Sequence, residues 1–440
     1  MHRGKGARPL HTPSEILAPI PITGGHGVRV PLRKLGPKER RNLALAAIAG
    51  FYLILTAYNL LTGGFFVPFG LDFLVFYSAG YVAGTWGWNR IYDVELLTKV
   101  QASFVPVLKQ LTVPHPFAFL PVFAIPFRLF ALLPPVPSFL LWTILNLLVL
   151  VYYLKLLMEE ASLSSKGRNL LAMFLLSFPV FHNFSFGQID VWLLLCIGEF
   201  MRAFLKGKHW KAGAWLAGLL LKPQALILVI PSLLLRKEFK TIGGFVLASM
   251  ALIIFSTIVS GLEGIKGLLA LWLSYRGGVF IIWQKCMMNW RAIQLHLSSL
   301  TSPAVGWAVT GIGMALTAGL AFYLWIKTPL HFRKNFATIV LGTFAATIIL
   351  AWHSHFHMGM LLLPPLIYLV DTIPAGLLDA WIFVPPGVLF LIYFAGALAR
   401  ATGQVLPEAY GCPVLGSCLF ILNFCLLIWC VREKNKATGR

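Results

Sequence analysis

Lys222 has the clearest chemical potential in this sequence, because it lies in the middle of an apolar stretch, residues 212–235. A lysine at the centre of a membrane helix costs about 2.5 to 3.5 kcal/mol on insertion scales, so it normally faces a protein-lined cavity and meets an anion there. We therefore expect a polar cavity that binds a negatively charged group. The alternative is that Lys222 pairs with one of the few buried acidic residues or lies near a surface.

Basic clusters flank this stretch on both sides. They consist of Arg202, Lys206, Lys208 and Lys211 before it and Arg236, Lys237 and Lys240 after it. Short basic loops stay on the cytoplasmic side of a membrane, so the chain should enter, turn at Lys222-Pro223 and return. Each arm of roughly 12 residues reaches about 18 Å, which is short of a hydrocarbon core of about 30 Å. The pattern predicts a half-spanning hairpin with Lys222 at its tip.

Asp72 is the candidate general base. It is the only acidic residue between the first apolar run and Asp93, and its neighbours are aromatic and apolar. A poorly solvated carboxylate can take the proton of a hydroxyl group. Alternatively Asp72 caps a helix, since it opens the run LDFLVFYSAGYVAG. Tyr77 of the same run is a further candidate for substrate binding.

Two further groups of polar residues interrupt apolar runs. Gln188 and Asp190 stand at the start of one run, where they bind substrate or cap the helix. His353, His355 and His357 alternate, so an extended strand would place all three on one face and a helix only the first and third. No carboxylate or cysteine lies beside them, so we predict no metal site. His355 and His357 are instead candidate contacts to a phosphate or an acceptor hydroxyl.

Asn289 and Arg291 lie in a long loop between apolar runs and could supply further anion contacts. The alternative is that Trp290 and Arg291 form an interfacial anchor. The six cysteines are scattered and none has a CxxC spacing. They predict neither a disulfide framework nor a zinc site.

The composition is that of an all-α polytopic membrane protein. The 440 residues are 58% hydrophobic and 12% charged, with a mean hydropathy of +0.80, whereas soluble domains are about 25% charged. The formal net charge of +21 could suggest nucleic acid. Its excess lies in the first 42 residues, the tail and short loops, where topology requires it, so we predict no nucleic-acid binding.

The apolar runs divide the chain into three parts. Residues 1–42 form a basic cytoplasmic segment, 43–431 a transmembrane domain and 432–440 a basic cytoplasmic tail. The transmembrane domain should hold about 12 helices, counting the two half-spanning arms separately. Two long outward loops, about 63–137 and 261–302, contain amphipathic runs that we expect on the membrane surface. Residues 117–133 contain prolines and an arginine, so we interpret them as interfacial or re-entrant.

Several short motifs together resemble a known family. They are LDFLVFYSAGYVAG, IYD at 91–93, PHPFAFLPVFAIPFRLF, FGQID, the LKP turn followed by basic residues, and WHSHFHMGMLLLPP. Over residues 45–370 the chain resembles the polyprenol-phosphate-mannose-dependent mannosyltransferases of the GT-C fold, glycosyltransferase family 87. The resemblance implies that Asp72 is the catalytic base and that the family's histidine is His357, seven residues before Pro364. Two features depart from the family: Ile189-Asp190 stands where members often have Asn, and a Ser-Pro pair before the histidines is absent.

The resemblance implies a multi-pass enzyme of the plasma (inner) membrane, with both termini cytoplasmic and the active site facing outward. It would transfer a hexose, mannose by resemblance, from a polyprenyl-phosphate sugar to a hydroxyl of a glycolipid or glycan acceptor. The reaction would be an inverting single displacement without a cofactor, with Lys222 at the donor phosphate and Arg291 or His357 as a further contact.

Three other classes use similar residues. A flippase or transporter of a lipid-linked saccharide or another anion would use the same cationic cavity without a base. An O-antigen-ligase-like enzyme would gather its arginines and histidine in one large outer loop. A cofactor-binding membrane subunit needs paired histidines inside the membrane, and we do not expect His182 to face the His353 group.

Overall fold

All regular elements in the described part of the chain are helices. The computed structural model describes residues 36–62, 64–66, 69–105, 116–163, 167–274, 284–330, 332–402 and 411–437. The chain divides into two compact units, Met1–Arg41 and Asn42–Arg440. Of the first unit only the beginning of one helix is described. The features below belong to the second unit.

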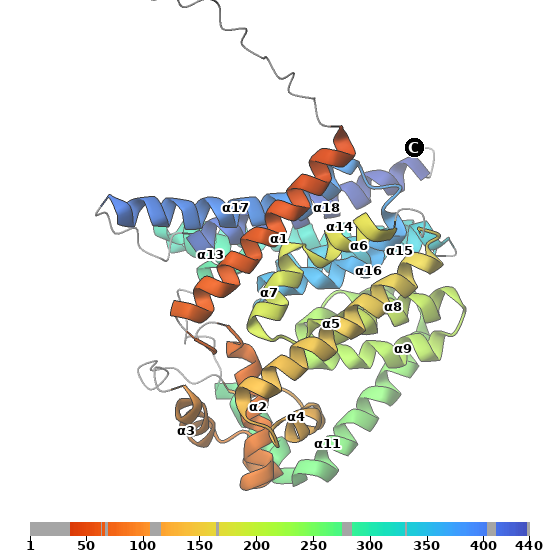
Figure 1. Ribbon diagram of the computed structural model, residues 1–440. Coiled ribbons are helices and arrows are strands. Elements are labelled where there is room, and N and C mark those ends of the chain that lie inside the picture. The colour runs from red at the N-terminus through yellow and green to blue at the C-terminus, as the bar shows by residue number, and fades with distance from the viewer. Residues whose placement is uncertain are drawn as a thin grey trace, which may run out of the picture. The chain divides into compact units, whose positions relative to one another are not determined.

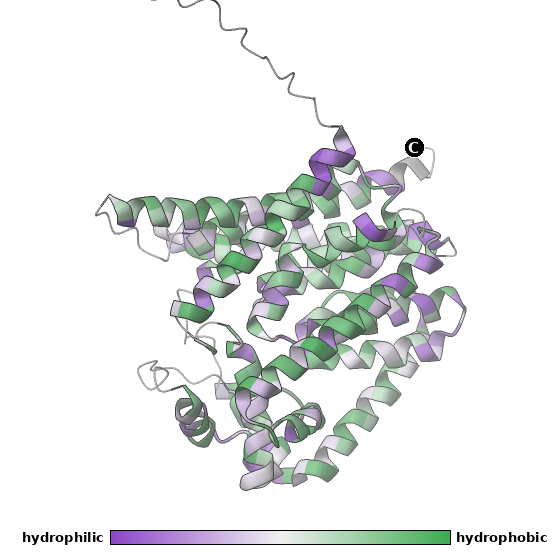
Figure 2. Ribbon diagram, in the orientation of Figure 1, coloured by the Kyte–Doolittle hydropathy of each residue, from purple (hydrophilic) through white to green (hydrophobic). Residues whose placement is uncertain are grey.

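Seven helices are long and apolar enough to cross a membrane. They are α1 (Pro37–Thr62), α5 (Pro135–Glu160), α11 (Phe239–Ser274), α14 (Pro303–Lys327), α15 (Arg333–Leu350), α17 (Ala375–Ala401) and α18 (Gly411–Ala437). An eighth span is possible if α6 (Gly167–Leu175) and α7 (Phe178–Phe186), bent by 52°, count as one. Figure 2 shows that these helices are predominantly hydrophobic along their lengths. The prediction of an all-α polytopic membrane protein is confirmed.

Shorter helices account for the remaining predicted segments. They are α8 (Asp190–Leu205), α9 (His209–Ala217), η5 (Gly218–Leu221), η6 (Pro223–Leu226), α10 (Val229–Leu235), η7 (Phe356–Leu362) and α16 (Leu363–Leu369). The predicted number of about 12 is therefore reached only when these short helices are counted. Breaks in these helices coincide with polar residues of the candidate site.

Residues 209–238 form the predicted hairpin. Its two ends lie together, since Nδ1 of His209 is 3.6 Å from Oε2 of Glu238. The backbone of Thr241 also approaches Gly213 so closely that a Cβ there would lie 1.8 Å from the Thr241 carbonyl oxygen. Lys222 breaks the helix at the tip, with φ −140° and ψ 83° between η5 and η6.

The helix that carries Asp72 is buried rather than amphipathic. In α2 (Leu71–Thr85) every residue from Phe73 to Gly80 is buried. Gly80 lets the backbone of α4 (Ile125–Phe130) approach, since a Cβ there would lie 2.2 Å from the carbonyl oxygen of Phe127. The expected amphipathic stripe is absent, because the apolar residues surround the whole helix. The location of this run on the membrane surface stays a prediction. Figure 1 places α2 and α4 beside the start of α5.

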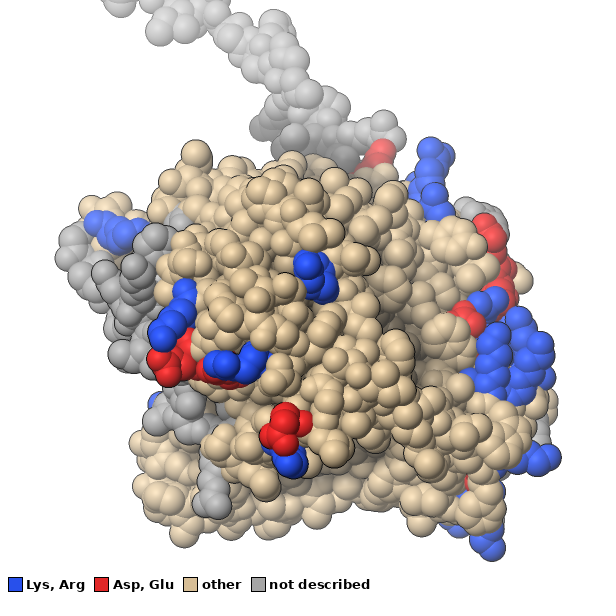
Figure 3. Space-filling model, turned by 90° about the horizontal axis from the view of Figure 1, so that it is seen from below, with Lys and Arg blue, Asp and Glu red and all other residues tan. Residues whose placement is uncertain are grey.

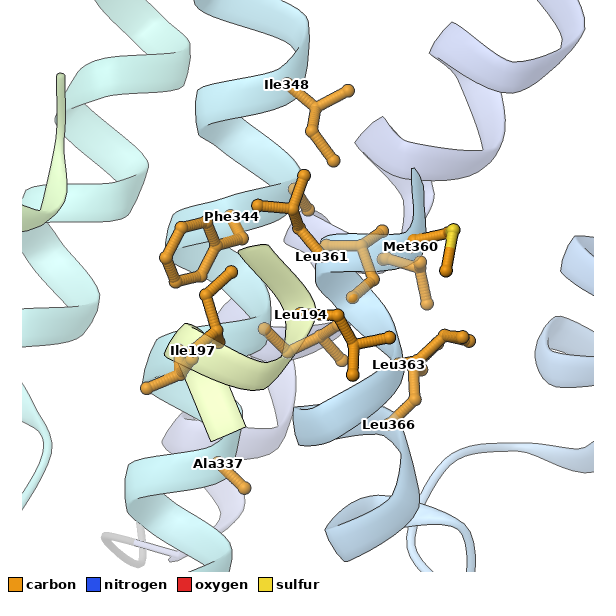
Figure 4. Close-up of a cluster of buried hydrophobic side chains, with 14 of the residues drawn as sticks. Leu194, Ile197, Ala337, Phe344, Ile348, Met360, Leu361, Leu363 and Leu366 are labelled. Atoms are coloured by element: carbon orange, nitrogen blue, oxygen red, sulfur yellow. The ribbon is translucent and has the colours of Figure 1, made fainter. Parts of the chain in front are cut away.

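The core centres on α15, whose apolar window is 83% buried. Figure 4 shows its residues Phe344 and Ile348 facing Leu194 of α8 and Leu361 of η7. Many apolar side chains elsewhere are exposed, as expected of helices that face lipid. The face in Figure 3 is largely uncharged; Lys and Arg residues gather at its right edge, and others are scattered over the left and centre.

Cys286 and Cys412 form a disulfide, although they are 126 positions apart. The bond joins the segment before α13 (Trp290–Leu300) to the start of α18. The prediction of no disulfide framework missed this bond, because two isolated cysteines give no spacing pattern and only the packing brings them together.

The hairpin predicts that both basic clusters lie on the same side of the membrane. A reporter fused after Lys208 and another after Lys237 should both be cytoplasmic, because the arms enter and leave on one side. Paired alkaline phosphatase and fluorescent protein fusions measure this directly. A periplasmic signal at either position contradicts the topology, and a fusion after Lys327 serves as a cytoplasmic reference.

Candidate active site

Five of the residues singled out in the sequence form one polar network. They are Asp72 of α2, Gln188 before α8, Asp190 at the start of α8, Lys222 at the hairpin tip and His357 of η7. Asp190, Lys222 and His357 are 0%, 6% and 4% exposed. Four segments distant in sequence therefore meet at one buried site.

Lys222 is paired with an acidic residue of the chain. Its Nζ donates to Oδ1 of Asp190 at 2.6 Å and to Oε1 of Gln188 at 2.9 Å. The ammonium group has three protons, so these two bonds leave one. This is the alternative in which the lysine meets a buried acid. An incoming anion would have to share the ammonium group with Asp190.

Gln188 connects Lys222 to Asp72. Its Oε1 accepts from Lys222 while its Nε2 donates to Oδ2 of Asp72 at 2.6 Å. Only this orientation of the amide satisfies both partners, because lysine can only donate and an ionised carboxylate can only accept. The half-buried Asp72 carboxylate is thus held through one of its oxygens. Two hydrogen bonds in series, both made by Gln188, connect it to the ammonium group.

His357 is oriented by Asp190. Its Nδ1 lies 2.5 Å from Oδ2 of Asp190 and 3.3 Å from Nζ of Lys222. Because the ionised carboxylate only accepts, Nδ1 carries the proton in this arrangement, and it cannot then accept from Lys222. Nε2 is the ring nitrogen left for a ligand, as an acceptor in the neutral ring or a donor in the protonated one.

Asp72 and Asp190 are not helix caps. The residue at the N-cap of α2 is Gly70, and that of α8 is Ile189; neither helix has a side-chain cap. The backbone amide of Asp190 donates instead to Oδ1 of the buried Asn183 at 3.2 Å. Both carboxylates therefore point into the network.

The turn between α7 and α8 sets the position of Asp72. Gly187 ends α7 with φ 71°, a left-handed conformation, and a Cβ there would lie 2.6 Å from Cβ of Phe73. Its carbonyl accepts from Nε1 of Trp142 at 3.2 Å. The amide of Gly70 donates to the carbonyl of Ser185 at 2.7 Å, which fixes the start of α2 against this turn. Only glycine fits at position 187, because both the backbone conformation and the contact exclude a side chain.

The other two histidines of the HSHFH segment lie beside the network. The ring of His355 is 4.7 Å from that of His353 and 6.1 Å from that of His357. His355 lies in the loop after α15, where burial, followed by the neighbouring imidazoles, holds its pKa well below the usual value. It therefore stays neutral. Among the residues that the structure describes, no three His, Cys, Asp or Glu side chains are grouped as a metal site requires.

Three predicted residues lie outside the network. The hydroxyl of Tyr77 donates to the carbonyl of Leu133 at 2.8 Å. Asn289 caps α13, and the guanidinium of Arg291 lies 4.4 Å above the ring of Trp352.

His182 adjoins the site although the sequence did not suggest it. Its ring centre lies 5.7 Å from that of His357 and 4.3 Å from that of Phe186, on which it stacks. The expectation that His182 does not face the histidine segment is wrong, because the bend between α6 and α7 turns this residue inward. Asn183 is likewise missed. Its one signal was its place beside FGQID in an apolar run.

Comparison with known proteins identifies the family. The sequence model of glycosyltransferase family 87 matches residues 117–352, more than half of the chain. The chain belongs to glycosyltransferase family 87. This member is a membrane glycosyltransferase. No curated protein and no solved structure matches it.

The matched range covers only part of the candidate site. Gln188, Asp190 and Lys222 lie within the matched range, whereas Asp72 precedes it and His357 follows it. The two outer residues join the family 87 segment through direct hydrogen bonds to Gln188 and Asp190.

The buried ion pair predicts a specific pattern of stabilities. Lys222→Met leaves the buried Asp190 carboxylate without its ammonium partner and with only His357 beside it, and breaking a buried ion pair costs about 3 to 5 kcal/mol. We expect Lys222→Met to lower the melting temperature in detergent and the double variant Lys222→Met, Asp190→Asn to recover most of the loss.

The control is Lys99→Met, which removes a lysine that is 70% exposed and paired with Glu95. It should melt like the wild type, because exposed pairs contribute little. Equal melting of the single and double variants would show that the two charges do not compensate each other.

Proposed function

We propose that this family 87 enzyme transfers a hexose, mannose by resemblance, from a polyprenyl-phosphate sugar to a hydroxyl of a glycolipid or glycan acceptor. Asp72, Gln188, Asp190, Lys222 and His357 form its active site. The observation that carries the proposal is the hydrogen-bonded chain from Asp72 through Gln188 to Lys222. One end of this chain is a carboxylate that can accept a proton. The other end is a cation that can face a phosphate.

The proposed reaction is a single displacement with inversion. Asp72 takes the proton of the acceptor hydroxyl, whose oxygen attacks the anomeric carbon. The bond from that carbon to the phosphate oxygen breaks, and the electron pair leaves with the polyprenyl phosphate. Negative charge grows on this phosphate in the transition state, where preorganised donors stabilise it most.

Two side chains are proposed as hydrogen-bond donors to the leaving phosphate. Lys222 has one ammonium proton beyond its bonds to Asp190 and Gln188. His357 offers Nε2, because Nδ1 faces Asp190, and Nε2 donates only when the ring is protonated. Asp190 fixes both groups through its two oxygens, so its proposed role is to position them. Among the candidates for substrate contact, His355 lies nearest to this set and Tyr77 and Arg291 lie outside it.

The disulfide supports an outward-facing site. Disulfides persist in oxidising compartments outside the cytoplasm. Cys286 lies in the second predicted outward loop and Cys412 at the end of α18 opposite the basic tail. Both positions are outward in the proposed topology, with residues 1–42 and 432–440 in the cytoplasm and the enzyme in the plasma (inner) membrane. The donor would reach the site laterally from the lipid bilayer.

Asp72→Asn tests the base. Asparagine keeps the size and can still accept from Gln188, but it cannot take a proton. We expect transfer from a radiolabelled polyprenyl-phosphate hexose to fall by about 10² or more, with donor binding close to normal. The assay uses the purified enzyme in detergent and scores both transfer and hydrolysis.

Asp93→Asn is the matched control. Hydrogen bonds from the Leu96 amide and from Arg90 hold the pKa of Asp93 below its usual value, so this substitution also removes a negative charge. Asparagine still caps α3 (Val94–Phe104), and activity should be retained. Near-normal turnover of Asp72→Asn contradicts its role as base. Bound donor that is neither transferred nor hydrolysed by the wild type would favour a transporter of lipid-linked saccharides.

Lys222 is tested by donor binding rather than by turnover. In the variant Lys222→Met, Asp190→Asn both charges are gone, so a binding loss is not caused by an unpaired carboxylate. A charge-assisted contact contributes about 1.5 to 3 kcal/mol, so donor binding should weaken roughly 10- to 150-fold. Asp190→Asn alone, which retains the ammonium group, separates the two effects. Normal donor binding by the double variant would assign the phosphate to other residues.

A further inference from the structure

A short segment beside the active site holds the histidine loop in place. We call residues 284–291 the strap and residues 351–357 the histidine loop. The amide of Met288 donates to the carbonyl of Ser354 at 3.3 Å. Every contact described below joins these two segments or anchors one of them.

Asn289 makes the central contacts of the strap. Its side chain is fully buried. Nδ2 donates to the carbonyl of Ala351 at 2.7 Å and to that of Trp352 at 3.3 Å. Oδ1 accepts from the amide of Ala292 at 3.1 Å and so caps α13. One amide group thus ties the start of α13 to the end of α15.

Trp352 adds a second fixed point. The guanidinium of Arg291 lies 4.4 Å from its ring centre, and the ring of Trp307 stacks on it at 6.1 Å with an angle of 12°. Both contacts are attractive, because the faces of aromatic rings are electron-rich and rings stack readily on each other. The loop is therefore held by its backbone and by its tryptophan.

The strap itself is anchored to α18. Cys286 is joined to Cys412, and the carbonyl of Cys286 lies against Gly416, where a Cβ would approach it to 2.6 Å. Helix α18 packs along α15, which leads into the histidine loop. Helix α13 contacts α18 as well. The anchor and the loop therefore share one rigid support.

The held residues lie directly before His357. Ser354 is three residues away, and His355 is the N-cap residue of η7, in which His357 lies. His357 in turn contacts Asp190. Since a shift of about 1 Å at a catalytic group can cost 10²-fold in rate, the loop backbone has to be fixed for His357 to act.

We propose that Asn289 is a positioning residue that, with the strap and its disulfide, holds His357 in place for the donor phosphate. This inference rests on the proposed function for the role of His357. It assigns to Asn289 a task that involves no contact with substrate. The bonds from Nδ2 carry that task, and the cap made by Oδ1 is separable from it.

Asn289→Ser separates the two tasks. Serine is a good helix cap but is too short to reach the carbonyls of the loop. We expect faster hydrogen exchange at the backbone amides of 351–357 and a fall in kcat of about tenfold, with little change in KM for the donor. Ser302→Ala is the control, because Ser302 caps α14 without touching the loop; it should change neither measurement.

The effect on kcat should pass through His357. In a His357→Ala background, Asn289→Ser should lower kcat by less than about twofold, since coupled residues are not additive. A tenfold fall in both backgrounds would overturn the positioning role and make Asn289 merely structural. Unchanged exchange of residues 351–357 in Asn289→Ser would overturn it as well.

A disulfide variant keeps the inference testable if Asn289→Ser does not fold. Cys286→Ser, Cys412→Ser should also speed exchange at 351–357 and lower kcat, whereas Cys425→Ser, which removes an exposed free thiol, should do neither. Exchange is measured without substrate. If the wild type transfers no sugar, the proposed function fails while the exchange results still decide whether the strap holds the loop.

Discussion

The buried pair of Asp190 and Lys222 is the interaction on which the rest of the structure depends. Taking an ion out of water costs several kcal/mol even after relaxation, and attraction repays this only when further hydrogen bonds satisfy both groups. Gln188 supplies one such bond to the ammonium group and His357 one to the carboxylate. The fold must therefore bring three segments to one point, and it interrupts its helices there. Gly187 ends α7, Lys222 interrupts the helical backbone at the tip of the hairpin, and η7 is a 3-10 helix instead of an α-helix.

Much of this site could be predicted because charge is rare in the apolar runs. Lys222, Asp190 and Gln188 stand out against residues that lipid or a core would accept, and the basic clusters around 212–235 indicate the hairpin by themselves. The long apolar helices followed from their length and composition, whereas the predicted number of about 12 is reached only when short helices are counted. These inferences need only local composition and the dimensions of a bilayer.

The partners of these residues could not be predicted. Nothing in the sequence distinguishes a lysine that meets a ligand from one that meets Asp190, because the choice depends on how the hairpin packs against α8. The same holds for Cys286 and Cys412, and for His182, which a bend turns toward His357. The burial of α2 was readable, since apolar residues occupy all its faces. Its position inside the predicted outward loop 63–137 suggested a surface helix instead.

The pairing also explains how a cation can be kept ready inside the protein. An unpaired charge in this environment would be costly, because nothing would replace the water it loses. Asp190 supplies the opposite charge for Lys222, and Gln188 and His357 fix the direction of both groups. Under the proposed function, the phosphate of the sugar donor then meets N–H groups that are already oriented toward it. Little reorganisation is therefore needed as negative charge develops on that phosphate. The cost of this arrangement is a weaker positive electrostatic potential at the phosphate, because the carboxylate of Asp190 offsets part of the charge of Lys222. Under the same proposal a protonated His357, held beside Lys222 by the same carboxylate, would offset this cost by donating from Nε2.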